Sequence, residues 1–148
     1  MSRRELRAKV MQALYANEMS GDPIAHLRST ILPEVEDDSP EYTYASRMLN
    51  RLIGDPSEVT ALLESHLKNW DRERVAVIDR ILIQMGIAEF LFFPDIPPKV
   101  TINEMIEIAK EYSTEKSGLF VNGILDAIRN DLVTEGRINK TGRGLVNS

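Results

Sequence analysis

A polar corner between two amphipathic segments carries the side chains best suited to chemistry in this sequence. Two aromatic residues, Tyr112 and Phe120, flank the corner, with Lys116 between them and Asn122 just after. Aromatic rings stack on unpaired bases, while cations and the amide groups at the start of a helix hold phosphates. This combination of residues is typical of a site for single-stranded RNA.

The same aromatic residues also fit the core of a simple helical hairpin. Tyr112 and Phe120 recur with apolar neighbours near the 3.6-residue period of a helix, so periodicity alone favours their burial. Ser117 is expected to cap the second helix, because serine accepts hydrogen bonds from first-turn amides. Asn122 has a second interpretation too, in which it bonds a loop backbone while Gly123 lets a neighbouring helix approach. Both interpretations of the corner stay open.

Residues for catalysis or metal binding are not grouped in the sequence. The chain has no cysteine, no glycine-rich phosphate loop and no H-E-x-x-H zinc motif. His26 and His66 have no second ligand at metal-binding spacing, so we interpret both as surface residues. Glu104 and Glu107 lie three residues apart, as on an ordinary solvated helix face. We therefore expect neither an enzyme nor a metal or cofactor site.

Length and composition predict one domain without a membrane segment. The chain has 148 residues, of which 43% are hydrophobic, and this is enough for one compact core. The most apolar window, residues 81–93, is shorter than the roughly 20 residues that cross a membrane. The amino terminus lacks the apolar run of a signal peptide. We expect a cytoplasmic protein.

Charge is distributed unevenly along the chain. The formal net charge is −5, but the first 18 residues carry four basic and two acidic side chains, and residues 137–148 carry three basic and no acidic ones. Basic ends on an acidic body indicate two surfaces, one for an anionic and one for a cationic partner. The alternative is that the terminal charges only keep the protein soluble.

Helical periodicity along nearly the whole chain predicts an all-α fold. The acidic link at residues 33–40 has a flexible composition and could separate two helical halves. Gly86 lies within a long apolar helix that ends near Phe92; it costs about 1 kcal/mol relative to alanine, which implies close helix packing or a kink. The basic tail at residues 136–148 has no periodic apolar face and is expected to be disordered.

Two segments carry a family resemblance through their order and spacing. The first is R-R-E-L-R-A-K-V-M-Q-A-L-Y at the amino terminus, and the second contains P-x-K-V-x-I-N-E, then A-K, then F-V-N-G-I-L-D. Together they resemble the NusB family of bacterial transcription antitermination factors. The resemblance implies one domain at residues 1–135, built from two small helical-bundle subdomains, about 1–70 and 71–135, joined by a long central helix.

The resemblance also implies partners. Similar proteins pair with the ribosomal protein also known as NusE, bind the single-stranded boxA element of nascent rRNA transcripts and act in the RNA polymerase antitermination complex. Some are homodimers and others monomers, so a homodimer stays open. The implied RNA contacts are Arg3, Arg4, Arg7, Tyr15, Tyr112, Lys116, Ser117, Phe120 and Asn122. The implied contacts with the protein partner are Asp79, Arg80 and Glu89.

The chain departs from the family pattern at two positions of the central helix. Gln84 and Ala88 stand where the family commonly has an arginine and a tyrosine, which removes an ionic group and an aromatic ring from the expected NusE interface. One alternative function is therefore a helical protein-interaction module with little RNA affinity. Another is the NusB-like domain of an rRNA cytosine methyltransferase, which would need a cofactor domain that this sequence lacks.

Overall fold

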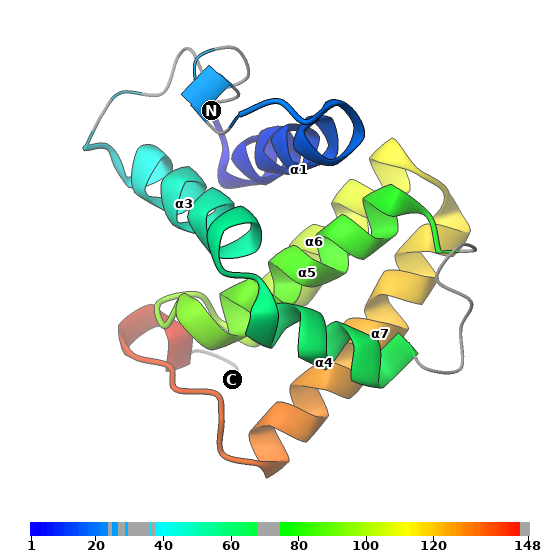
Figure 1. Cartoon of the computed structure of the whole chain (residues 1–148). Coiled ribbons are helices and arrows are strands. Elements are labelled where there is room, and N and C mark those ends of the chain that lie inside the picture. The colour runs from blue at the N-terminus through cyan, green and yellow to red at the C-terminus, as the bar shows by residue number, and fades with distance from the viewer. Residues whose placement is uncertain (24, 27–28, 30–35, 37, 68–74, 146–148) are drawn as a thin grey trace. The chain divides into compact units, whose positions relative to one another are not determined.

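The structure is a computed structural model that describes residues 1–23, 25–26, 29, 36, 38–67 and 75–145. The chain divides into two compact units, Met1–Pro56 and Ser57–Ser148. Every regular element among the described residues is helical, which confirms the all-α prediction (Figure 1). The sequence also indicates a short helix at residues 24–32; this segment and the acidic link at residues 33–40 lie largely outside the described residues.

The first unit contains α1 (Arg3–Ser20), α3 (Pro40–Leu49) and the π-helical turn η1 (Asn50–Gly54). α1 and α3 pack against each other. Ser2 caps α1 by accepting a hydrogen bond from the Glu5 amide at 3.0 Å. The buried side chains of α1 and α3 include Leu6, Val10, Met11, Tyr44, Met48 and Leu49.

The second unit is built around one buried helix. Its elements are α4 (Ser57–Leu67), α5 (Val77–Phe92), α6 (Pro98–Tyr112), α7 (Glu115–Thr134) and the short 3-10 turn η3 (Gly142–Leu145). α4, α6 and α7 all pack on α5. The buried apolar residues of α5 point in every direction around its axis, as expected for an interior helix; they are Ile81, Leu82, Ile83, Met85, Ile87, Ala88 and Phe90.

The division between the units differs from the expected one. The sequence predicts subdomains that meet near residue 70, but the structure places the division between Pro56 and Ser57. The reason is that α4 packs on α5 and α7 and so belongs to the second unit. α5, the expected connecting helix, lies inside that unit.

Gly86 allows α5 and α7 to pack closely. A Cβ atom added at Gly86 would lie 2.6 Å from the Cδ2 atom of Leu125 on α7, which is closer than packed carbon atoms approach. Close helix packing is therefore confirmed as the reason for this glycine. Gly123 is different, because it is exposed and a Cβ added there would meet nothing within 4 Å. The interpretation that Gly123 admits a neighbouring helix is wrong.

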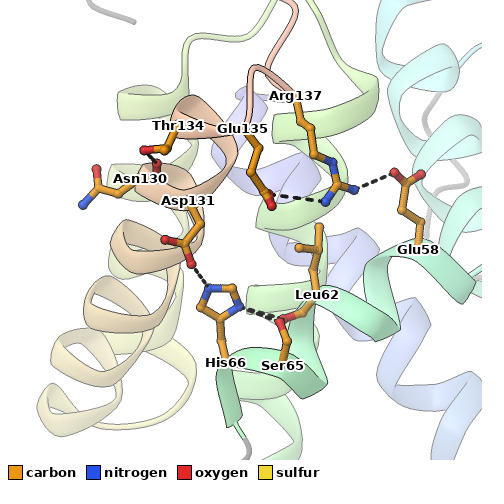
Figure 2. Close-up of polar contacts among 9 residues, drawn as sticks. All are labelled: Glu58, Leu62, Ser65, His66, Asn130, Asp131, Thr134, Glu135 and Arg137. Carbon is orange, nitrogen blue, oxygen red and sulfur yellow. Dashed lines mark hydrogen bonds and ion pairs between the residues drawn. The ribbon is translucent and has the colours of Figure 1, made fainter.

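Polar contacts connect the end of α4 to α7 and the start of α4 to the segment just after α7 (Figure 2). The His66 ring is bonded through Nε2 to Asp131 Oδ2 at 2.7 Å and through Nδ1 to the Leu62 carbonyl oxygen at 2.9 Å. Near the start of α4, Glu58 Oε1 accepts from Arg137 Nη2 at 2.9 Å. His66, interpreted from the sequence as a surface residue, thus also connects α4 with α7.

The segment after α7 folds back onto the end of α5. The Lys140 ammonium is buried and donates hydrogen bonds to the carbonyl oxygens of Glu89 and Phe93, at 2.8 and 2.9 Å. These carbonyls lie at the carboxyl end of α5, where each also accepts one backbone amide, from Phe93 at 3.3 Å and from Ile96 at 3.1 Å. Lys140 thus caps α5 from a distant part of the chain.

A close backbone contact fixes the same segment. The Thr141 amide donates to the Pro94 carbonyl oxygen at 2.9 Å. A Cβ added at Gly144 would lie 1.9 Å from that same oxygen, so only glycine fits there. The prediction that the tail is disordered is wrong for residues 136–145, because one buried lysine and one glycine hold them against α5 and the turn after it.

The first prediction concerns the two helical glycines. Gly86→Ala should lower the free energy of unfolding by about 1 to 3 kcal/mol, because the added methyl overpacks the buried Leu125. Gly123→Ala is the matched control and should raise it by about 0.5 to 1 kcal/mol, because only helix propensity changes. Urea unfolding of the two variants measures both values. Equal effects of the same sign would contradict the close contact at Gly86.

The second prediction concerns Lys140. Burial lowers the pKa of Lys140 to about 8, and the charges of Glu89 and Asp95 raise it in part. Lys140→Met keeps the apolar stem but removes the two ammonium hydrogen bonds to the Glu89 and Phe93 carbonyls, so it should cost about 1 to 3 kcal/mol at neutral pH. Between about pH 8 and pH 10 the folded chain has released this proton while the unfolded chain retains it, so the wild type should gain stability with pH relative to the variant. Urea unfolding across this range tests the difference, and parallel curves would refute it.

Candidate nucleic-acid interface

The corner between α6 and α7 is tighter than the sequence suggests. Only Ser113 and Thr114 separate the two helices. Thr114 is the N-cap of α7, since its Oγ1 accepts a hydrogen bond from the Ser117 amide at 3.1 Å. The prediction that Ser117 itself caps the helix is wrong, because Thr114 already occupies the cap position three residues earlier. Lys116 therefore lies in the first turn of α7.

Four side chains form what we call the corner surface: Tyr112, Lys116, Leu119 and Phe120. Tyr112 is 38% exposed and Leu119 is 75% exposed, Lys116 is exposed, and Phe120 is half-buried. Leu119 and Phe120 follow Lys116 by three and four residues, so these three share one face of α7. The interpretation of Tyr112 as a core residue is wrong, and Phe120 is only partly covered.

The electrostatics of the corner suit an anion. The first turn of a helix carries unbonded amides and a partial positive charge. Lys116 adds a full positive charge to this turn, although Glu115 offsets part of it. Asn122 is exposed but lies six residues beyond Lys116, on a different side of α7. An anionic group is therefore best placed at Lys116, away from Asn122.

Two of the predicted site residues lie beneath the corner. Ser117 is buried and its hydroxyl donates to Ser113 Oγ at 2.8 Å. Asp79, a predicted partner contact in the first turn of α5, is 6% exposed. Burial raises the pKa of the Asp79 carboxyl, and hydrogen bonding with Ser117 and Ser113 lowers it in part. Neither Asp79 nor Ser117 presents its side chain to a partner in this conformation.

The other predicted partner contacts do not share a surface with Asp79. Glu89 is fully buried in the last turn of α5, where its Oε1 accepts from the Thr101 hydroxyl at 2.7 Å. This bond joins α5 to α6. Asp79 and Glu89 are ten residues apart, about 15 Å along the helix, and Arg80 is half-buried. The structure does not bring the three together as one interface.

The remaining candidates belong to α1 in the first unit. Arg3, Arg4 and Tyr15 are exposed, whereas Arg7 is only 2% exposed. The guanidinium carbons of Arg3 and Arg7 lie 5.0 and 5.6 Å from the centre of the Tyr44 ring on α3, within the range of cation–π attraction. Arg7 therefore joins α1 to α3, and the RNA-facing candidates of this unit are the three exposed residues.

Sequence reasoning missed one residue of the corner surface and one feature of the tail. The helical period could have predicted the exposure of Leu119. It places Leu119 on the same face as Lys116 and away from the buried Val121 and Leu125. Lys140 gives no such signal, because a lone lysine in a polar tail does not reveal a distant carbonyl partner. Among the described residues, no three potential ligand side chains are grouped to hold a metal ion. None of the described helices is long and apolar enough to cross a membrane.

Comparison with known proteins identifies relatives along most of the chain. The model of the NusB family matches residues 4–130. The transcription antitermination protein NusB of Salinibacter ruber is 44% identical to this chain, over 98% of this chain and 91% of its own length.

Solved structures agree with this assignment. NusB of T. maritima has a TM-score of 0.74 at 36% identity, covering 88% of this chain and 92% of that one. A crystal structure of the antitermination factors NusB and NusE in complex with double-stranded RNA contains a chain with a TM-score of 0.75 at 25% identity, covering 87% of this chain and 96% of that one. With a family model, a close relative and solved folds in agreement, this chain belongs to the NusB family.

Proposed function

We propose that this protein is a non-catalytic, RNA-binding transcription antitermination factor. In this proposal it pairs with NusE and binds the single-stranded boxA element of nascent rRNA transcripts in the RNA polymerase antitermination complex. The observation that carries the proposal is the corner surface, where an exposed tyrosine and an exposed lysine meet the amide-rich start of a long helix. Support also comes from relatives described as antitermination proteins and from a similar chain solved with NusE and RNA.

The aromatic content of the corner surface favours unpaired RNA. In a duplex the bases are stacked on each other and their faces are closed to side chains, so proteins read duplex RNA through its backbone and shape. Tyr112 offers a partly exposed ring that could stack on a base, and the apolar Leu119 lies nearby on α7. Lys116 would hold the adjacent phosphate. This pairing of ring and cation is the usual device for binding a single strand.

A helical protein-interaction module with little RNA affinity is the second candidate. The net charge of −5 favours it, because an acidic body repels phosphate. The departures from the family pattern at Gln84 and Ala88 support this second candidate less strongly than the sequence suggests. Ala88 is fully buried in α5, so a partner cannot reach that position directly, and Gln84 is half-buried.

The third prediction tests the proposed function directly. A single-stranded boxA RNA should bind the protein weakly on its own and at least ten times more tightly in the presence of NusE, because one small basic corner on an acidic protein gains from further basic contacts. Fluorescence anisotropy with labelled RNA gives both affinities. A duplex of the same sequence and a scrambled single strand are the controls.

Each outcome of this titration distinguishes the candidates. Equal affinity for the boxA strand with and without NusE would refute the proposal that NusE adds contacts with the RNA. Tighter binding of the duplex would refute the preference for an unpaired strand. Binding to NusE with no measurable RNA affinity in either case would establish the protein-interaction module instead.

The fourth prediction isolates Lys116. Each phosphate that a cation neutralises on a single strand contributes a slope of about −0.7 in log K against log salt. Lys116→Gln should therefore flatten the salt dependence of RNA binding by about 0.7. Lys99→Gln is the matched control, because Lys99 is exposed in the first turn of the same α6 whose last residue is Tyr112, about 20 Å along the helix from the corner. An equal change in both slopes would show that only the overall charge matters.

A further inference from the structure

Gly123 is a helical glycine that no feature of the described residues requires. Helices α5 and α7 contain three glycines, and two of them allow close packing. A Cβ atom added at Gly86 would lie 2.6 Å from Leu125 Cδ2, and one added at Gly118 would lie 2.8 Å from Lys110 Cγ. A Cβ added at Gly123 would meet no described atom within 4 Å. Gly123 also has no positive φ that would require a glycine.

This glycine makes α7 less stable than an alanine would. A glycine within a helix is less favourable than alanine, because it loses more conformational freedom when the chain folds. Gly123 is exposed and lies well inside α7, away from both ends of the helix. A bare backbone at such a position suits the close approach of another molecule, which a side chain would prevent.

Gly123 adjoins the corner surface on the next turn of α7. It follows Lys116 by seven residues, Leu119 by four and Phe120 by three, so the four residues are neighbours on one face of the helix. Helical side chains lean toward the amino terminus of their helix. A side chain at position 123 would therefore extend over the turn that holds Leu119 and Phe120. The glycine leaves these two side chains uncovered by residue 123.

The chemistry of this bare turn suits a nucleobase better than a phosphate. Inside a helix each backbone amide is bonded to the carbonyl four residues earlier, so Gly123 offers van der Waals contact and no spare donor. Leu119, on the adjacent turn, is apolar and 75% exposed. The flat face of a base fits such a surface, whereas a phosphate requires a cation such as Lys116.

The charges of α7 limit contact with RNA to the part of the helix near the corner. Asp126 and Asp131 are exposed beyond Gly123. Arg129 does not offset them freely, because its Nη1 atom is paired with Asp126 Oδ1 at 3.7 Å. These carboxylates repel phosphate. An RNA strand that binds at Lys116 can thus extend over Gly123 but not along the rest of α7.

We propose that one base of an unpaired RNA strand rests on the bare backbone at Gly123, beside Leu119 and Phe120, while a neighbouring phosphate is held by Lys116. This inference rests on the proposed function and adds a base-contacting position to the corner surface. Gly123 then serves RNA binding at a cost to the stability of the protein. A segment of NusE is the other occupant that the experiment below distinguishes.

The fifth prediction uses opposite effects of one substitution on stability and on binding. Gly123→Ala should resist urea better than the wild type, yet bind boxA RNA with NusE about fivefold more weakly, because the methyl group prevents close contact. Gly123→Leu should cover the adjoining turn and weaken binding by roughly twentyfold or more. Asn130→Leu is the matched control and should leave the affinity unchanged, because Asn130 is exposed on α7 about 10 Å further from the corner.

The salt dependence of binding identifies which part of the nucleotide lies at Gly123. Loss of a base contact changes no phosphate neutralisation, so Gly123→Ala should lower the affinity while keeping the wild-type slope of log K against log salt. A slope flattened by about 0.7, as expected for Lys116→Gln, would place a phosphate there and overturn the base contact. Unchanged affinity in both Gly123→Ala and Gly123→Leu would also overturn it.

Titration of NusE without RNA tests the other occupant. Gly123→Ala and the wild type should bind NusE equally. Weaker binding of NusE by the variant would assign this face of α7 to the protein partner and contradict the inference.

The same variants separate this inference from the proposed function. Loss of RNA affinity in Lys116→Gln, with unchanged affinity in both Gly123 variants, would refute the base contact alone. Unchanged affinity in all three variants would refute the corner surface as the RNA site, and the base contact with it.

Discussion

The burial of α5 is the constraint on which the second unit depends. A helix that is covered on every side cannot satisfy its polar groups with water, so each one needs a partner from another element. Thr101 on α6 donates to the Glu89 side chain, and Lys140 donates to the Glu89 and Phe93 carbonyls at the carboxyl end. These polar contacts of α5 tie α6 and the terminal segment to the buried helix.

This constraint divides the charged residues into two groups with different roles. Arg7, Asp79, Glu89 and Lys140 are buried, and Arg7, Glu89 and Lys140 connect elements within a unit. Arg3, Arg4 and Lys116 are exposed at the surface. The family resemblance implies binding roles for residues of both groups. Only the exposed residues can contact a ligand, because the buried ones are covered by other elements. The buried charges instead join the elements of their own unit.

The sequence predicts the helical class and most helix positions because these depend on local periodicity and on turn residues. Gly21, for example, ends α1 with a left-handed φ of 73°, as the Ser-Gly-Asp-Pro run indicates. The sequence also indicates the corner between α6 and α7, but it does not decide the cap. Thr114 and Ser117 are both good capping residues, and only the geometry of the link chooses Thr114. The burial of Lys140 and Asp79 is not predicted from the sequence. It depends on segments far away along the chain, which no local pattern encodes.

The contact of Lys140 with the end of α5 has a consequence for folding during synthesis on the ribosome. The lysine follows the Glu89 and Phe93 carbonyls that it bonds by 51 and 47 residues. A ribosome adds residues one at a time, roughly 5 to 20 each second, so the end of α5 waits several seconds for its cap. During that interval the Glu89 and Phe93 carbonyls lack the lysine, and the second unit gains this contact only when nearly all of its described residues have been made.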